Sequence, residues 1–141
     1  MITHFQDDDF VFVVDQASGD VILDLIGFSE QGPALPEKLL MRFERCGWCS
    51  CFLGAFEAHW DPLDKVNLDE VVRDYADIPR IDYCEHWPVR GACVHSVTCC
   101  RSTGRTSVTI VTNVGTLVLR EVDGADPHSD SELLWHPSRN G

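Results

Sequence analysis

Runs of β-branched and aromatic residues mark the first two elements that the sequence predicts. Residues 10–14 read FVFVV, a composition typical of a strand. In residues 21–28, Val21, Leu23 and Leu25 alternate with Ile22, Asp24 and Ile26, which indicates a second strand. The short connection between the two runs contains Gly19, so we expect the two strands to form a hairpin.

Helical spacing follows in residues 36–46. Pro36 suits the first position of a helix, because its missing N–H costs nothing there. Apolar residues recur three or four positions apart from Leu39 to Cys46. Gly47 can then end the helix in a left-handed conformation. The pattern therefore predicts a first helix over this segment.

A second helix is expected near residues 67–78. Asn67 is the predicted N-cap, with Glu70 as the capping-box acid three residues later, and Pro79 limits the helix. Between the two helices, residues 48–60 are largely apolar. We interpret them as a strand with a bend at Gly54, and a buried helix is the alternative.

The C-terminal half of the chain predicts mainly β structure. Residues 92–100, 106–112 and 115–122 are short strand candidates with tight connections, which is typical of an antiparallel meander. Ser129 and Glu132 match the capping box of one last short helix. The expected fold class is therefore α+β: a single antiparallel sheet of five to seven strands with two or three helices, in one globular domain of residues 1–141.

The charge of the chain is strongly one-sided. Its 23 Asp and Glu residues face only 11 Lys and Arg residues, so the net charge is −12. The acids concentrate in residues 7–37 and 57–85. This field repels phosphates, which disfavours direct binding to nucleic acid or membranes and favours a basic protein partner. The alternative is that the acids only keep the protein soluble.

The compartment is predicted from what the sequence lacks. No apolar stretch approaches the roughly 20 residues that cross a bilayer, and the N-terminus has no pattern of a secretory signal. The number of cysteines is odd, at seven, which argues against a complete disulfide framework. We therefore expect a cytoplasmic protein with reduced cysteines that act mostly as small apolar residues.

One cysteine pair has the spacing of a redox motif. The C-x-x-C of Cys46 and Cys49 resembles that of thioredoxin-like proteins, and the resemblance implies a reactive thiolate at a helix N-terminus. In thioredoxin-like proteins the motif follows a strand and precedes a helix. Here the residues before Cys46 are expected to form a helix, so the order of the elements differs. The preferred interpretation is two core cysteines on either side of a helix-ending glycine.

Two C-x-H pairs form a second candidate for chemistry. Cys84 and His86 lie nine residues before Cys93 and His95. If the two segments paired as strands, two sulfurs and two imidazoles could converge on a zinc ion. The preferred interpretation is cysteines that face a core beside ordinary histidines, so no metal or other cofactor is predicted.

No nucleophile elbow, phosphate-binding loop or calcium loop occurs in the sequence, so we expect a protein without catalysis. The preferred hypothesis is an acidic binding protein, of the inhibitor or immunity type, that blocks a basic or nucleic-acid-handling site on a partner such as a toxin or nuclease. The alternatives are a small zinc- or thiol-dependent domain, or an accessory structural domain without separable activity. The residues expected to bind the partner are acids of the two acidic stretches and one tryptophan: Asp7, Asp8, Asp9, Asp69, Asp74, Asp77 and Trp87.

Overall fold

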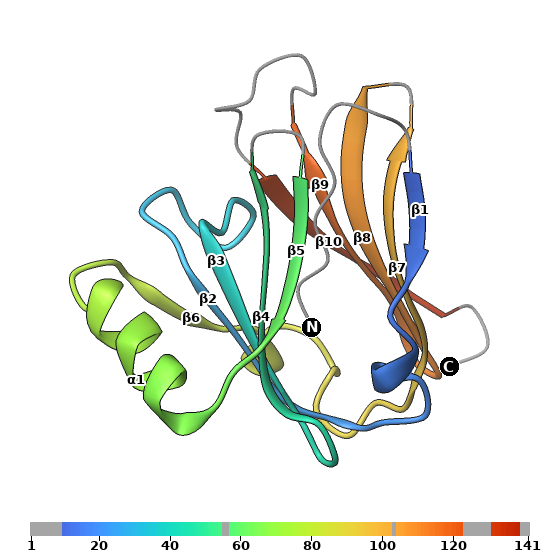
Figure 1. The fold of residues 1–141 in the computed structure, drawn as a ribbon, viewed down its shortest axis with the longest axis horizontal. Coiled ribbons are helices and arrows are strands. Elements are labelled where there is room, and N and C mark those ends of the chain that lie inside the picture. The colour runs from blue at the N-terminus through green and yellow to red at the C-terminus, as the bar shows by residue number, and fades with distance from the viewer. Residues whose placement is uncertain (1–9, 55–56, 103, 123–130, 139–141) are drawn as a thin grey trace.

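The two layers of the fold are antiparallel β-sheets. The computed structural model describes residues 10–54, 57–102, 104–122 and 131–138. Sheet I contains, in spatial order, β1 (Phe10–Val13), β7 (Val94–Ser102), β8 (Arg105–Thr112), β9 (Gly115–Glu121) and β10 (Ser131–Pro137). Sheet II contains, in spatial order, β5 (Glu57–Pro62), β4 (Gly47–Gly54), β3 (Lys38–Phe43), β2 (Ile22–Phe28) and β6 (Arg80–Asp82). The sheets face each other, and α1 (Lys65–Asp74) lies beside sheet II (Figure 1).

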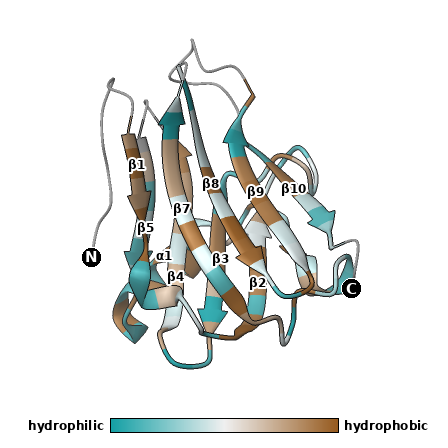
Figure 2. Ribbon diagram, turned by 90° about the vertical axis from the view of Figure 1, so that its right-hand side faces the viewer, coloured by the Kyte–Doolittle hydropathy of each residue, from teal (hydrophilic) through white to brown (hydrophobic). Residues whose placement is uncertain are grey.

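A core of apolar side chains fills the space between the sheets. Sheet I contributes residues such as Val97, Ile110 and Leu117, and sheet II contributes Leu25 and Met41, all at most 4% exposed. Burial alternates along β8, because successive side chains of a strand point to opposite faces of the sheet. The same alternation appears as bands of hydropathy along the strands of sheet I (Figure 2).

The helix α1 covers part of the outer face of sheet II. Leu68 and Val71 face the sheet, together with residues that follow the helix, and they pack on three buried residues of β2 and β3: Ile26, Phe28 and Leu40. Asp64 caps the helix, and its carboxylate accepts a 2.8 Å hydrogen bond from the N–H of Asn67. The predicted second helix is thus confirmed, although it begins earlier because Asp64 is the N-cap. No helix of the described residues is long and apolar enough to span a membrane.

The predicted fold class is wrong, because there are two sheets and the described residues contain only one α-helix. The first predicted helix is instead strand β3. Leu39 and Met41 point into the core between the sheets, while Leu40 points outward under α1. Both faces of this strand are therefore covered by apolar neighbours. Its near-continuous apolar run also contains apolar residues at helical spacing. The local pattern alone therefore cannot distinguish a buried strand from a helix.

The predicted first hairpin is also wrong. β1 pairs with β7 in sheet I, whereas β2 pairs with β3 and β6 in sheet II. A short 3-10 turn, η1 (Asp15–Ala17), follows β1 before the chain enters the other sheet. The connection is short enough for a hairpin, but pairing with strands distant in sequence prevails. Such long-range pairing leaves no local signal in the sequence.

The remaining predictions concern residues 48–60 and the C-terminal half of the chain. The meander of three strands is confirmed as β7, β8 and β9. Residues 48–60 are β structure, as the preferred interpretation expects, but they form a hairpin of two strands, β4 and β5, and not one strand with a bend at Gly54. The last predicted helix is wrong, since residues 131–137 form β10 against β9, with Leu133 in the core. Ser129, its predicted cap, lies outside the described residues.

Candidate functional site

The predicted partner-binding acids of the second acidic stretch lie on and just after α1. Asp69 and Asp74 belong to the helix, Asp77 lies in the turn that follows, and all three are exposed. Sequence reasoning missed a fourth exposed acid, Glu70, because it was assigned to a capping box. Since Asp64 is the actual N-cap, the Glu70 carboxylate has no such role. These four carboxylates are called the α1 acids below.

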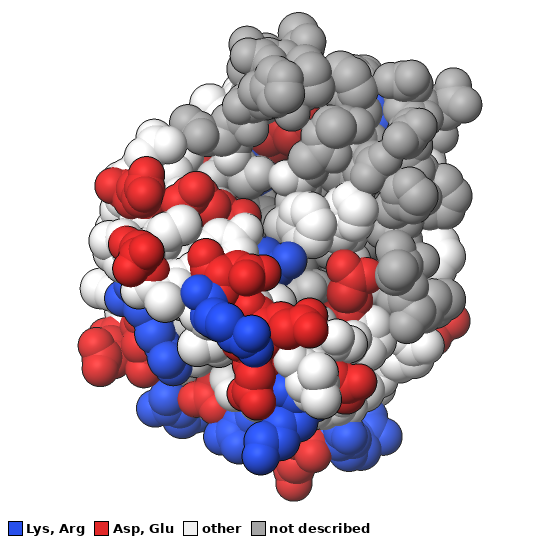
Figure 3. Space-filling model, turned by 60° about the vertical axis from the view of Figure 1, so that its left-hand side comes forward, with Lys and Arg blue, Asp and Glu red and all other residues white. Residues whose placement is uncertain are grey.

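The α1 acids are exposed carboxylates without a Lys or Arg partner, a property that they share with Asp15, Glu30, Glu44 and Glu85 among the described residues. Elsewhere, five arginines form ion pairs with carboxylates within 4 Å, namely Arg42, Arg45, Arg90, Arg101 and Arg120. None of the α1 acids forms such a pair with Lys or Arg within the part of the chain that the structure describes. α1 also carries Lys65 and Arg73, so positive charges are interspersed on this side of the molecule (Figure 3). The acids still outnumber them, which leaves a net negative surface.

The other predicted partner-binding residues do not join this surface. Asp7, Asp8 and Asp9 lie outside the described residues. Trp87 stacks between Tyr83 and Trp135, at ring-centroid distances of 5.2 and 6.4 Å, and packs against the core between the sheets. Because α1 lies on the outer face of sheet II, the structure does not bring Trp87 together with the α1 acids.

The C-x-H pairs do not converge. Cys84 lies on η2 (Tyr83–Glu85), a short 3-10 turn, and not on a strand. Cys93 precedes β7, and both His86 and His95 are exposed. Among the described residues, no group of three or more His, Cys, Asp or Glu side chains is arranged to hold a metal ion. The described residues therefore do not form the set of ligands that the zinc alternative expects.

The C-x-x-C cysteines are not activated thiols. Cys46 lies in the turn between β3 and β4, and Cys49 lies on β4, so no helix begins at either thiol. Burial raises the pKa of Cys46, and the neighbouring Asp20 carboxylate raises it further. Burial, together with the nearby Cys46, raises the pKa of Cys49 to about 12. Redox thiols need a lowered pKa, so the thioredoxin-like resemblance is not supported.

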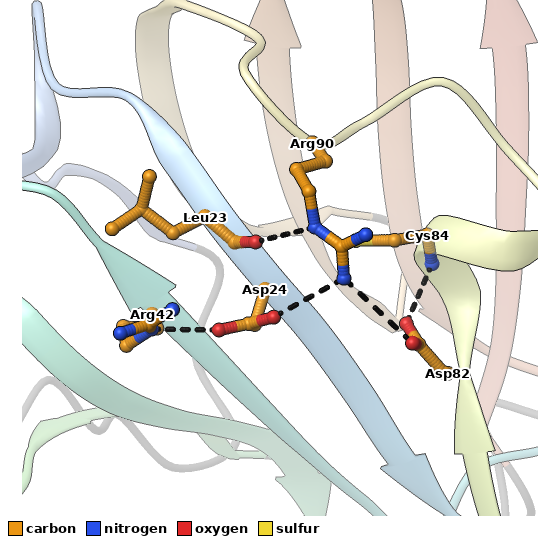
Figure 4. Close-up of polar contacts among 6 residues, drawn as sticks. All are labelled: Leu23, Asp24, Arg42, Asp82, Cys84 and Arg90. Carbon is orange, nitrogen blue, oxygen red and sulfur yellow. Dashed lines mark hydrogen bonds and ion pairs between the residues drawn. The ribbon is translucent and has the colours of Figure 1, made fainter.

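A network of ion pairs occupies the arginines on the outer face of sheet II. Asp24 of β2 accepts from Nε of Arg42 at 2.6 Å and pairs with Nη2 of Arg90 at 3.3 Å (Figure 4). Arg90 also pairs with Asp82 of β6 at 3.7 Å and donates to the carbonyl of Leu23. These groups satisfy one another, so this cluster offers no free cation to an anionic ligand.

A cavity of about 210 Å³ opens where η1 meets the strands of sheet II. Its floor consists of Ala17, Phe43, Cys49 and Trp60, each at most 2% exposed. Three exposed residues form the rim, namely Gln16, Cys46 and Pro62. The cavity is thus apolar inside and reachable from solvent.

Comparisons of the chain with protein-family models, with curated proteins and with solved structures found no match. The function is therefore argued from two features of the described residues, the α1 acids and the cavity. They lie on different parts of the molecule, because α1 packs on the outer face of sheet II, whereas the floor of the cavity belongs to the core between the sheets.

Proposed function

We propose that the protein is a non-catalytic binding protein that presents the α1 acids to a basic protein partner. One observation carries the proposal: four exposed carboxylates without Lys or Arg partners among the described residues gather on one helix and the turn that follows it. Carboxylates that are already paired gain little from a second cation. Unpaired ones form charge-assisted hydrogen bonds with a partner's lysines and arginines.

The helix also offers apolar contact beside its charges. Val66 is 67% exposed and Val72 is 41% exposed, although both lie on a helix whose other face is packed on the sheet. An interface gains affinity when apolar side chains are buried at its centre and charges surround them. Val66 and Val72 supply such contacts, and the α1 acids accelerate encounter with a basic surface.

The chemistry of the surface indicates the class of partner. A site that handles nucleic acid presents lysines and arginines toward phosphates. Carboxylates on a rigid helix can occupy those same side chains and exclude the nucleic acid. The proposed role is therefore that of an inhibitor or immunity-type protein for a basic partner, such as a toxin or nuclease.

A pull-down from the native cell extract tests the proposal. The bait proteins are the wild type and a variant in which the α1 acids are neutralised: Asp69→Asn, Glu70→Gln, Asp74→Asn and Asp77→Asn. The wild type should retain a basic protein at about 0.05 M salt and release it at about 0.5 M, because salt screens exposed charges. The variant should retain much less of this protein at low salt, and a retained nuclease should lose activity when wild type is added.

A matched control separates the helix from the overall charge. It neutralises four exposed acids outside α1 and the turn that follows it: Asp15→Asn, Glu30→Gln, Glu44→Gln and Glu85→Gln. This variant has the same net charge as the first and should retain the partner. Equal losses in both variants would show that total charge, and not α1, governs binding. Failure of the wild type to retain any protein at low salt would favour the accessory structural domain instead.

A further inference from the structure

The cavity floor is built by groups from both sides of the fold. Ala17 belongs to η1, which follows β1 of sheet I, whereas Phe43, Cys49 and Trp60 belong to strands of sheet II. The rings of Phe43 and Trp60 lie 5.9 Å apart at an angle of 40°. At the rim, the thiol of Cys46 donates a hydrogen bond to the carbonyl of Gln16 at 3.1 Å, which ties the two sides together.

None of the described residues that line the cavity carries a charged side chain, although the chain has a net charge of −12. Among these described lining residues, the ionisable groups are the thiols of Cys46 and Cys49. Burial raises the pKa of Cys46 and raises that of Cys49 to about 12, so both remain neutral at pH 7. A charged ligand would lose its hydration there, and none of the described lining residues supplies a counterion. The lining therefore selects a neutral guest.

The size of the cavity limits the guest further. A dry apolar cavity of about 150 Å³ in a protein holds benzene. The cavity here measures about 210 Å³, which leaves room for a slightly larger ring system. Aromatic walls favour an aromatic guest, because offset or edge-to-face ring contacts add to the gain from burial.

We propose that this cavity is a binding site for a small, neutral aromatic molecule of about the size of indole. The guest contacts Phe43 and Trp60 and lies beneath the Cys46–Gln16 hydrogen bond. This site shares no residue with the α1 acids and does not depend on the proposed partner. The protein would therefore carry a small-molecule site on one part of the fold and a protein-binding surface on another.

Three indole probes test the proposal by isothermal titration calorimetry: neutral indole, anionic indole-3-carboxylate and cationic tryptamine. Neutral indole should bind with a dissociation constant below about 1 mM. Each charged probe should bind at least about tenfold more weakly, which corresponds to about 1.4 kcal/mol. No measurable binding of indole, or equal binding of all three probes, would overturn the proposal.

Alkylation by iodoacetamide locates the guest. Cys46 is exposed at the rim, whereas Cys100 lies on the outer face of sheet I and serves as the internal control. Saturating indole should slow alkylation of Cys46 severalfold and leave that of Cys100 unchanged, as measured by peptide mass spectrometry at a fixed alkaline pH. Protection of neither cysteine, or of both alike, would place the guest elsewhere and contradict the proposal.

Filling the cavity supplies a variant test. Ala17→Leu adds apolar atoms to the floor and should abolish indole binding, while Ala34→Leu adds the same atoms at an exposed position and should bind as the wild type does. If Ala17→Leu does not fold, Cys49→Met fills the cavity from β4 and takes its place. Undiminished indole binding by a folded cavity-filled variant would refute the assignment.

Discussion

Asp20 is the buried group on which the turn between β3 and β4 depends. Its side chain is 1% exposed and accepts three backbone hydrogen bonds. The N–H groups of Val21 and Arg45 donate to Oδ1 at 2.8 and 2.9 Å, and the N–H of Cys46 donates to Oδ2 at 2.9 Å. This carboxylate therefore fixes the turn that carries the Cys46 rim of the cavity.

The cost of removing this carboxylate follows from those contacts. A hydrogen bond to a charged group contributes about 1.5–3 kcal/mol, so three of them set an upper range of about 4.5–9 kcal/mol. Arg45 and Cys46 are exposed, so water replaces part of the loss at their N–H groups. We expect Asp20→Ala to lower the free energy of unfolding by about 3 kcal/mol, or the Tm by about 6–12 °C.

Urea denaturation followed by tryptophan fluorescence measures this difference, with Asp15→Ala as the control at an exposed acid. The control should change the free energy of unfolding by less than about 0.5 kcal/mol. A loss below about 1 kcal/mol for Asp20→Ala would refute the argument, because each hydrogen bond to the carboxylate would then contribute almost nothing.

The pKa of Asp20 determines how the difference in unfolding free energy between the wild type and Asp20→Ala changes with pH. Burial raises the pKa of Asp20, but the hydrogen bonds from Arg45, Cys46 and Val21 lower it by more, so its pKa lies below the ordinary value. The charged form is then favoured by folding, and its stabilisation is complete above the unfolded-state pKa of about 3.9. The difference between wild type and Asp20→Ala should shrink as the pH falls below about 4 through the folded-state pKa. A difference that grows with acidification would contradict this sign.

Two further predictions concern the packing and charges of sheet II. A Cβ on Gly27 would lie 2.5 Å from Cε2 of Tyr83, so Gly27→Ala should destabilise the fold by at least about 2 kcal/mol in urea denaturation. Tyr83→Leu should lessen that penalty, and an unchanged penalty would mean that the clash is not its cause. Asp24→Ala removes the shared partner of Arg42 and Arg90 and should cost about 1 kcal/mol, since these exposed pairs are individually weak. A cost that does not decrease in high salt would argue against an ionic origin.

The sequence identifies strands best where one face is apolar and the other polar. The meander of residues 94–121 has this alternation, and the prediction is confirmed there. It fails at Lys38–Phe43, where α1 covers one face and the core covers the other. A strand that is covered on both sides loses its period of two, and only the tertiary structure reveals why.

The candidate site was predictable only in part. The acidic composition led to Asp69, Asp74 and Asp77 as partner-binding residues; the structure places all three in exposed positions on or next to α1, and their role in binding stays a prediction. The sequence could not reveal that Glu70 has no capping role, because that depends on which residue caps the helix. Whether a carboxylate is paired depends on arginines far away in sequence. The cavity lies between η1 and strands of sheet II, and no local sequence pattern indicates that these segments meet.

The affinity of the captured basic partner tests the central claim most directly. Its dissociation constant is measured by calorimetry for the wild type, the α1 variant and the matched control, at about 0.05 M and 0.5 M salt. We expect the α1 variant to bind at least about 100-fold more weakly than the wild type at low salt, and the matched control to bind within about threefold of it. A smaller difference at high salt would accord with a charged interface. Equal affinities of the wild type and the α1 variant at low salt would contradict the role of the α1 acids.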